Sequence, residues 1–318
     1  MRMRKIDAFV ISIFVLCLMV LPVLLSGCKR RRSDKPTIAL VMKSLANEFF
    51  KTMEEGAKAH HKAHADEYEL IAVGIKDEED VARQIDLVEL MIGRADAIVI
   101  APADSKALVS VCKRAKDAGV VVVNIDNQFD EAVLRDRDVK FPFVGPDNRK
   151  GAGIAGEYLA KRLQKADKVA ILEGIPNAFN AVQRKLGFED AMKAAGINIV
   201  SSQSAYWETA KAEPIVSALI TQYPDLRAVL CSNDSMALGA VAALRAAGKT
   251  EDVLVVGFDN IAAVQRLLKE GKVLCTIDQH ADKLAIYGIE YALEILAKGQ
   301  SPSDRETPVD LITADTLK

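Results

Sequence analysis

Short apolar runs alternate with amphipathic segments through the first half of the chain. The apolar runs lie at 37–42, 68–73, 97–100 and 120–125, and the segments with helical spacing lie at 47–64, 80–91 and 105–118. Runs that are apolar at nearly every position are typical of parallel strands covered on both faces. Strands that alternate with helices indicate a doubly wound sheet with right-handed crossovers. The pattern therefore predicts an α/β fold.

A polar stretch at 128–140 and a Pro/Gly-rich stretch at 141–147 separate this half from the next. Two prolines and one glycine so close together predict a chain crossing rather than a central strand. The second half then repeats the scheme, with helices expected at 148–163, 181–194, 209–221, 235–246 and 261–270 and strands at 169–172, 197–202, 228–231, 253–258 and 273–277. A last helix at 283–297 and a strand-like run at 309–312 have no counterpart in the repeat, so we expect both to return to the first half.

Two stretches of the chain are similar to each other, and each ends on an acid. The first begins with DSKAL at Asp104 and ends at Asp126, and the second begins with DSMAL at Asp234 and ends at Asp259. Each follows an apolar run, so each predicts strand, helix and strand. Since ligands bind beyond the carboxyl ends of parallel strands, we predict two similar lobes with one carboxylate at a strand tip of each. Asp104 and Asp234 are instead expected to cap helices.

The N-terminal segment predicts export. Three Lys/Arg residues among the first five precede an apolar run at 8–25, which ends in Leu-Ser-Gly-Cys. That ending resembles a bacterial lipobox, so we expect residues 1–27 to be a lipoprotein signal peptide and Cys28 to carry lipid. An uncut membrane anchor is the alternative, since about 18 apolar residues are enough to span a bilayer. Both interpretations place the rest of the chain outside the cytoplasm, either periplasmic or at the cell surface. The basic segment 28–35 is expected to be a tether that contacts anionic lipid headgroups.

The net charge, the cysteines and the length of the chain limit the class of protein that is expected. Removal of residues 1–27 takes away three Lys/Arg and one Asp, so 39 basic and 43 acidic residues remain and the net charge is −4 with neutral His. This balance argues against a nucleic-acid partner. Cys112, Cys231 and Cys275 remain, and buried free thiols are expected; a Cys231–Cys275 disulfide is the alternative. About 290 residues suit two domains of ordinary size.

Two motifs resemble known sites but lack the context that those sites require. Gly-Ala-Gly-Ile-Ala-Gly at 151–156 matches the dinucleotide fingerprint, but it lies inside an expected helix rather than in the turn after a strand. We therefore expect these glycines to allow close helix–sheet packing. His60 and His64 are one helical turn apart, but no third ligand is evident, so neither a metal nor a cofactor is expected. No nucleophile elbow, Cys/His pair or acidic pair is found, and the chain is not expected to be an enzyme.

A set of polar and aromatic residues lies at strand ends or just beyond them. Carboxylates, amides and guanidinium groups form paired hydrogen bonds with vicinal hydroxyls, and aromatic rings cover the apolar C–H faces of a sugar. Helix capping is the alternative role for such residues, but Asp126 and Asp259 end the two similar stretches in the same way. The candidate ligand-binding residues are Lys43, Asn47, Phe49, Phe50, Asp126, Asn127, Arg184, Trp207, Asn233, Asp259 and Gln279.

Five motifs that contain most of these residues follow one another along the chain. They are Ile38-Ala39-Leu40-Val41 with Asn47-x-Phe49-Phe50, Asn124-Ile125-Asp126, Arg184-x-x-Gly187-Phe188, Cys231-Ser232-Asn233-Asp234-Ser235-Met236-Ala237-Leu238-Gly239, and Val255-Val256-Gly257-Phe258-Asp259. Together they resemble the ribose- and allose-binding members of the periplasmic sugar-binding protein family, over residues 36–317. The resemblance implies two type I periplasmic-binding-protein lobes joined by a multi-strand hinge. Lobe one would comprise 36–145 with 281–308, and lobe two with the hinge crossings 146–279 with 309–318.

The resemblance also implies a role for each candidate residue. Those from Lys43 to Asn127 would bind the sugar from lobe one, those from Arg184 to Asp259 would close on it from lobe two, and Gln279 would reach it from the hinge. Lys43 and Trp207 match the allose binder, whereas ribose binders have serine and phenylalanine at these positions. Asn127 departs from both, because arginine or glutamate is usual there, so the exact sugar stays open.

In function, the resemblance implies the sugar receptor of an ABC importer. We expect an extracytoplasmic lipoprotein, monomeric, that captures a monosaccharide in the cleft between the lobes and delivers it to a membrane permease. One alternative is a sensor that binds a polyol or signalling sugar and feeds a chemoreceptor or kinase, and another is an exported α/β enzyme. A lac-repressor-type regulator shares the core fold, but the chain has no helix-turn-helix and carries an export signal.

Overall fold

The computed structural model describes residues 35–299 and 303–317. The chain divides into two units, Met1–Lys35 and Pro36–Lys318, and the folded architecture is that of the second unit. The predicted signal peptide, the lipidation site at Cys28 and nearly all of the basic tether lie outside the described residues. Within the described ranges, no helix combines the length and the hydropathy needed to cross a membrane.

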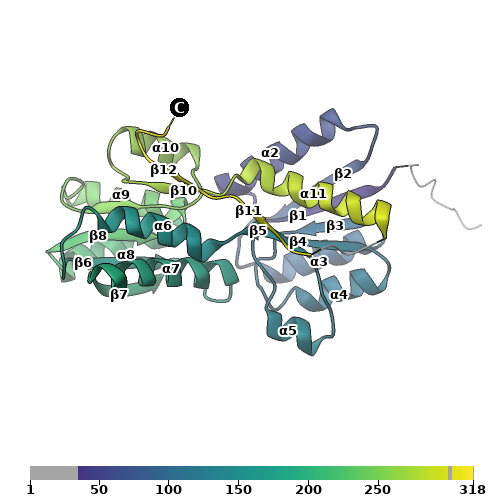
Figure 1. The fold of residues 1–318 in the computed structure, drawn as a ribbon, viewed down its shortest axis with the longest axis horizontal. Coiled ribbons are helices and arrows are strands. Elements are labelled where there is room, and N and C mark those ends of the chain that lie inside the picture. Colours follow the sequence, from purple (N-terminus) through teal and green to yellow (C-terminus); the bar gives the residue numbers. More distant parts are fainter. Residues whose placement is uncertain (1–34, 300–302, 318) are drawn as a thin grey trace, which may run out of the picture. The chain divides into compact units, whose positions relative to one another are not determined.

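Six parallel strands form the first sheet, in the order β11-β5-β4-β3-β1-β2. The strands are β1 (Thr37–Ser44), β2 (Glu69–Ile75), β3 (Ala97–Ile100), β4 (Val121–Ile125), β5 (Phe143–Pro146) and β11 (Arg305–Thr307). Alternate residues of a strand face opposite sides of the sheet. One face packs under α2 (Glu48–Ala63) and α11 (Ala281–Lys298), and the other under α3 (Val81–Ile92) and α4 (Val109–Asp117). We call this sheet, its four helices and the short α5 (Glu131–Asp136) lobe one (Figure 1).

Four parallel strands form the second sheet, in the order β7-β6-β8-β9. They are β6 (Lys168–Glu173), β7 (Asn198–Ser204), β8 (Leu226–Cys231) and β9 (Leu254–Val256). One face is covered by α6 (Asn148–Ala160) and α7 (Phe179–Ala195), and the other by α8 (Thr209–Gln222) and α9 (Asp234–Ala246). We call this sheet with its helices, including α10 (Ala262–Lys269), lobe two. Two sheets with helices on both faces confirm the predicted α/β class.

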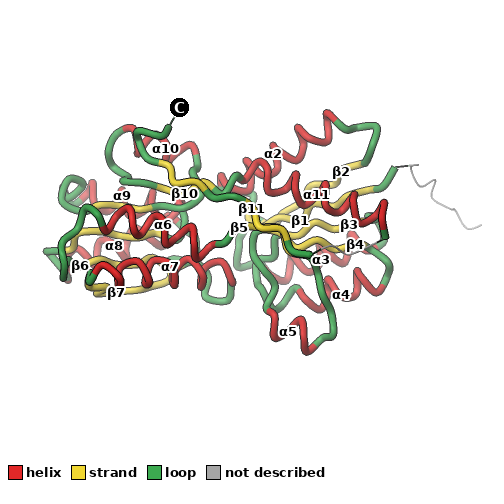
Figure 2. Tube along the Cα trace, viewed as in Figure 1, coloured by secondary structure: helices red, strands yellow, loops and turns green. Residues whose placement is uncertain are grey.

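The chain passes between the two lobes three times. The passages are from β5 to α6, from β10 (Thr276–Asp278) to α11, and from β11 to β12 (Asp310–Ile312). β10 and β12 pair antiparallel, and Figure 2 shows this ladder as a separate pair of strands beside α10. These three connecting segments form a hinge, because the chain can bend there while both sheets stay intact.

The prediction for 141–147 is right in part: the chain does cross to lobe two directly after β5, but β5 itself is an internal strand of the first sheet. It pairs in parallel with β4 on one side and with β11 on the other. Pro142 precedes the strand and Pro146 is its last residue, so the prolines leave the N–H groups between them free to form hydrogen bonds. The N–H of Phe143, at the start of the strand, donates to Asp304 Oδ1 at 2.8 Å.

The two C-terminal expectations have different outcomes. α11 packs on lobe one, as predicted for the helix at 283–297. The run at 309–312 does not return there, because β12 pairs with β10. The short strand β11, which the sequence pattern misses, returns instead and forms the edge of the first sheet.

The cap prediction is wrong for Asp234 and holds in modified form for Asp104. Asn233 is the N-cap of α9 and accepts from Met236 N at 2.9 Å, whereas Asp234 is the first residue of the helix. The carboxylate of Asp234 instead accepts from Thr276 Oγ1 and from Ile261 N, which joins α9 to the following elements of lobe two. Asp104 Oδ1 accepts from two N–H groups in the turn that precedes α4.

The glycine-rich run and the cysteines are structural. Residues 151–156 lie inside α6, so they do not form the turn that a dinucleotide site requires. A Cβ at Gly156 would lie 2.6 Å from the Cβ of Ala191, so this glycine allows α6 and α7 to approach closely, whereas a Cβ at Gly151 would lie 3.2 Å from the ring of Phe258 and 3.5 Å from Ile277 of β10. Cys112, Cys231 and Cys275 are free and buried, which confirms the expected free thiols.

Candidate ligand-binding site

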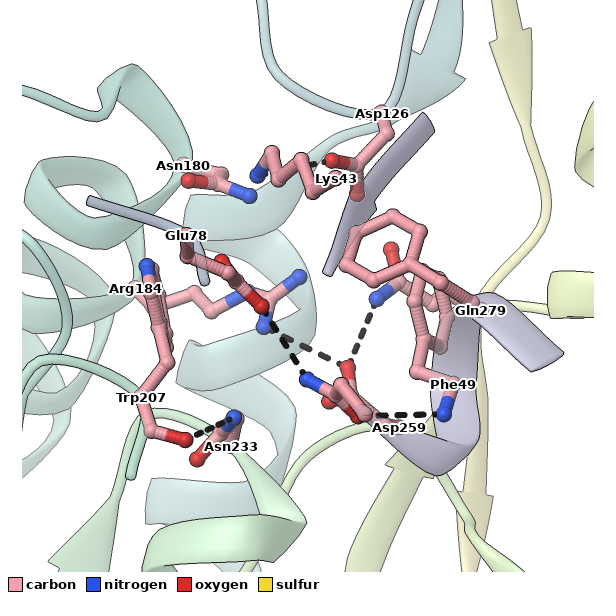
Figure 3. Close-up of a pocket in the computed structure, with 12 residues that line it drawn as sticks. Lys43, Phe49, Glu78, Asp126, Asn180, Arg184, Trp207, Asn233, Asp259 and Gln279 are labelled. Carbon is pink, nitrogen blue, oxygen red and sulfur yellow. Dashed lines mark hydrogen bonds and ion pairs between the residues drawn. The ribbon is translucent and has the colours of Figure 1, made fainter. Parts of the chain in front are cut away.

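A small cavity of about 20 Å³ lies between the two lobes, at the carboxyl ends of their strands. Figure 3 shows side chains of both lobes directed into it. The lining residues are Lys43, Asn47, Phe49, Phe50, Glu78, Asp126, Asn180, Arg184, Trp207, Asn233, Asp259 and Gln279.

Ten of the eleven candidate residues therefore line one cavity, although they come from seven separate segments. Asn127 is the exception: it is completely buried beside the cavity, and its amide bonds to Ser105, Pro102 and Asn180. Glu78 and Asn180 line the cavity but are absent from the candidate set. Glu78 follows the end of β2, so its position after a strand is a signal that predicts it. Asn180 lies one helical turn before Arg184 on α7, so helical spacing from Arg184 predicts it.

The acids at the two strand tips share an unusual backbone conformation. Asp126 has φ +62° and Asp259 has φ +121°, both in the left-handed region that residues with a side chain rarely adopt. Such conformations cost on the order of 1–3 kcal/mol and persist only where the surrounding structure imposes them. The two halves of the chain thus place a strained acid at equivalent positions, which extends the similarity of the two stretches to backbone geometry.

Each buried cation of the cavity has an anionic partner. Lys43 Nζ lies 2.9 Å from Asp126 Oδ2 within lobe one. Arg184 Nη1 lies 3.4 Å from Asp259 Oδ1 within lobe two, and the same carboxylate oxygen accepts from Gln279 Nε2 at 2.7 Å. These four charged side chains are at most 5% exposed. Because the pairs neutralise each other, these four residues offer hydrogen-bonding groups and little net charge, and Glu78, whose partner is the neutral amide of Asn47, is the remaining ionisable group of the lining.

The guanidinium of Arg184 is fixed by contacts on several sides. Its Nε donates to Asn148 Oδ1 at 2.8 Å, and its Nη1 donates to the main-chain oxygen of Ser232 at 2.9 Å. Its Cζ lies 3.7 Å from the centroid of the Phe258 ring and 5.6 Å from that of Trp207. This arrangement holds the guanidinium before a ligand arrives, which lowers the entropic cost of binding.

Burial shifts the pKa of several groups at the site. It raises the pKa of Asp259 well above its usual range, although Arg184 opposes the shift. Burial likewise raises the pKa of Glu78, against the opposing effect of Lys43 and of the hydrogen bond from Asn47. Desolvation lowers the pKa of Arg184, and Asp259 opposes that shift. The directions agree with an enclosed site from which water is largely excluded.

Aromatic rings form the apolar walls of the cavity. The rings of Phe49 and Phe50 meet edge to face, with centroids 5.1 Å apart and planes at 87°. Trp207, on the lobe-two side, is 6% exposed and has φ +69°. Asn47 caps α2 by accepting from Phe49 N at 3.1 Å, and its amide donates to Glu78 Oε1 at 3.2 Å. The cap therefore positions the two rings and one polar group together.

Several polar atoms of the lining have no partner. Among the described residues, Asn180 Oδ1, Gln279 Oε1 and Trp207 Nε1 are buried side-chain atoms without a hydrogen bond. A buried polar atom without a partner costs about 1–3 kcal/mol. Two acceptors and one donor gathered at one cavity therefore indicate a ligand with hydroxyl groups, which both donate and accept.

Comparison with known proteins agrees with this geometry. Residues 38–301 match the family described as "Periplasmic binding protein domain". A D-ribose/D-allose-binding protein of Pseudomonas aeruginosa is 58% identical over 296 residues, which cover 91% of this chain and 92% of that protein.

Two solved structures are also similar. An ABC transporter solute binding protein from Burkholderia multivorans, which holds an unknown ligand, has a TM-score of 0.86 and 56% identity and covers 88% of this chain and 100% of its own. An ABC transporter periplasmic solute binding protein from Actinobacillus succinogenes with bound D-allose has a TM-score of 0.84 and 36% identity, with coverage of 88% and 98%.

Proposed function

The chain belongs to the periplasmic binding protein family, whose close members are solute-binding proteins rather than enzymes, and from this premise we propose that it captures a monosaccharide and delivers it to an ABC importer. D-Ribose and D-allose are the proposed ligands, since the P. aeruginosa relative is described as binding both. Lys43 and Trp207, the residues that resemble the allose binder, favour D-allose of the two.

The observation that carries this proposal is the composition of the enclosed cavity. Its two cations, Lys43 and Arg184, are each paired with an acid, and Glu78 adds a further acid, so the lining offers no unpaired cation to an anionic ligand and suits an uncharged one. A ligand that both donates and accepts hydrogen bonds would satisfy the unpaired atoms of the lining, which are Asn180 Oδ1, Gln279 Oε1 and Trp207 Nε1. A monosaccharide meets both demands, and its C–H faces match the rings of Phe49, Phe50 and Trp207.

Binding is proposed to be coupled to closure of the two lobes. The residues of lobe one surround one side of the cavity, and those of α7, the β7–α8 loop and the β9–α10 loop surround the other. A sugar that contacts both sides binds the closed form better than an open form, and this difference shifts the equilibrium toward closure. The three interlobe segments are proposed to act as the hinge, with proposed lobe boundaries at 145/146, 279/281 and 308/309.

Titration calorimetry with D-ribose and D-allose tests the sugar site. We expect one sugar per chain and recovery of the sugar unchanged by NMR. A sugar phosphate is the matched control, because the lining has no unpaired cation for an added dianion and carries the further acid Glu78. Absence of binding to any neutral monosaccharide, or binding of the phosphate instead, would contradict the proposal.

Export and anchoring are proposed from the N-terminal sequence. Cys28 is the proposed lipidation site, the chain is proposed to be a monomer held at the membrane by this lipid, and a permease is its proposed partner. Expression of Cys28→Ala in a Gram-negative host tests the anchor. We expect the wild-type chain in the membrane fraction with incorporated palmitate, and the variant without palmitate.

A further inference from the structure

The amino end of α7 receives its cap from the other lobe. The N-cap residue of this helix is Ala178, which has no side-chain acceptor for the first N–H groups. Instead, Phe179 N donates to Ser105 Oγ at 3.0 Å, and Asn180 N donates to Asn127 Oδ1 at 3.2 Å. Ser105 follows β3 and Asn127 follows β4, so both acceptors belong to lobe one.

The two capping side chains are linked to each other and held in place. The hydroxyl of Ser105 donates to Asn127 Oδ1 at 3.2 Å. Asn127 Nδ2 donates to Pro102 O at 2.8 Å, so the amide presents its oxygen, and not its nitrogen, to α7. Both side chains are buried, and the main chain adds a contact from Ser105 N to Asn177 O at 3.4 Å. We call this set of interlobe hydrogen bonds the clasp.

α7 carries two residues of the cavity. Asn180 and Arg184 are one helical turn apart, so they lie on one face of the helix, and both line the cavity. Asn180 takes part in the clasp through its main-chain N–H, while its side-chain Oδ1 is one of the unpaired atoms. The clasp thus fixes the end of the helix that presents these side chains.

We propose that Ser105 and Asn127 are positioning residues for sugar binding, which act through the clasp on α7 and not by contact with the sugar. The inference rests on the proposed function, because it concerns closure of the same site. The clasp bonds join the two lobes, so they form only in the closed arrangement and stabilise that arrangement alone. Asn127 thereby acts on the site from outside the cavity.

Ser105→Ala is the decisive variant. Loss of a helix cap of this kind weakens closure, and we expect the Kd for D-allose and for D-ribose to rise about fivefold. The rise should come mainly from faster sugar dissociation, measured by stopped flow, because the clasp opens before the sugar leaves. The Tm of the sugar-free protein should change less than that of the sugar-bound protein. Ser105→Thr keeps the hydroxyl and should restore affinity, and Asn127→Ala should behave as Ser105→Ala does.

Asp167→Ala is the matched control, because it removes a side-chain acceptor from a bond confined to lobe two. Asp167 Oδ2 accepts from Gln164 N at 2.8 Å in the turn after α6. This variant should lower the Tm equally with and without sugar and leave the Kd unchanged. An unchanged Kd for Ser105→Ala, or an equal fall of its two Tm values, would overturn the clasp.

Failure of the proposed function has a different signature. In that case the wild-type chain itself binds neither D-allose nor D-ribose. The clasp is then tested on the sugar-free chain by small-angle X-ray scattering. A larger radius of gyration for the Ser105→Ala/Asn127→Ala double variant supports the clasp, and an identical radius overturns it.

Discussion

Asp126 and Asp259 occupy equivalent positions, but each neutralises a different cation. Asp126 pairs with Lys43 in lobe one, and Asp259 pairs with Arg184 in lobe two. Removing one member of a buried pair leaves the other charge without compensation, which costs more than the lost contact alone. We therefore expect sugar affinity to be most sensitive to substitution at these two pairs.

Asp126→Ala and Arg184→Ala are each expected to weaken sugar binding by about 1–3 kcal/mol, because each leaves buried partners without a hydrogen bond. Titration calorimetry measures the change. Lys106→Ala is the control, since it removes a largely exposed cation 3.7 Å from Asp130, outside the cavity. An affinity near that of the wild type for either cavity variant would show that the sugar binds elsewhere.

Asp234 predicts a pH dependence of stability. Burial raises its pKa from 3.8 to about 7 in the folded chain. A raised carboxyl pKa means that the folded state binds the proton more tightly, so this group lowers the free energy of unfolding as the pH rises from about 4 to about 7. Relative to the wild type, Asp234→Asn should gain up to about 4 kcal/mol of stability over that interval. Urea unfolding at pH 4.5 and pH 8 checks this; a difference that is the same at both values would contradict it.

The sequence predicts ten of the twelve residues that line the cavity and misses Glu78 and Asn180. Asp126 and Asp259 are found because two stretches repeat the same ending. Glu78 lies in the run Asp77-Glu78-Glu79-Asp80, which is typical of a solvated turn, and only the tertiary fold brings it to Asn47. Asn127 is predicted to be a contact because it follows Asp126, but the positive φ of Asp126 redirects the chain toward Ser105.

At the scale of elements, α6 and α7 pack closely because glycines line their contact. A Cβ at Gly187 would lie 2.2 Å from Arg149 O, whereas a Cβ at Gly153, on the facing helix, would lie 4.0 Å from Gly187 O, an ordinary contact distance. The first glycine is thus required by packing, and the second is not. The sequence suggests close packing from residues 151–156, but not which partner helix they meet.

Gly187→Ala is expected to lower the free energy of unfolding by about 1–3 kcal/mol, because the two helices must move apart. Gly153→Ala on the same interface should instead be neutral or stabilise the protein by up to about 1 kcal/mol, since alanine is the better helix former. Chemical denaturation of both variants measures the contrast. Equal effects would contradict the packing argument.

The sequence pattern fails to predict those strands whose pairing depends on residues far away along the chain. β5 is short and flanked by prolines, and it becomes internal only because β11 arrives from about 160 residues further along the chain. β11 and β12 have three residues each, too few for a periodic pattern to define. Strands and helices with long apolar patterns, by contrast, lie within a few residues of their predicted bounds.

At the scale of the whole molecule, several polar contacts hold the described lobes together besides the clasp. Lys211 Nζ, on α8, lies 2.5 Å from Glu79 Oε2 of lobe one, and Ala262 N of lobe two donates to Glu48 Oε1. Both contacts are accessible to solvent, so water and salt weaken them. Closure without sugar therefore depends on weak surface contacts and on the buried clasp.

A sugar that binds only the folded, closed chain should raise its stability in proportion to saturation. At a concentration one hundred times the Kd, the expected gain is about 2.7 kcal/mol. Thermal unfolding with increasing D-allose measures it, and small-angle X-ray scattering should show a smaller radius of gyration with sugar. A Tm that does not respond to D-allose, D-ribose or related neutral sugars would exclude a monosaccharide site.

The order of the strands has a consequence for biogenesis. The sheet of lobe two and its helices come from one continuous stretch, 148–269, with only the β10–β12 ladder completed later, whereas lobe one needs both α11 and β11 from the last forty residues. A chain emerges from the ribosome amino end first, so the face of β3 and β4 under α11 and the edge of β5 stay uncovered until synthesis is nearly finished. The half that is made first is thus the half that matures last, while truncation from the C-terminus removes β12, the partner of β10, before it reaches β11 and α11.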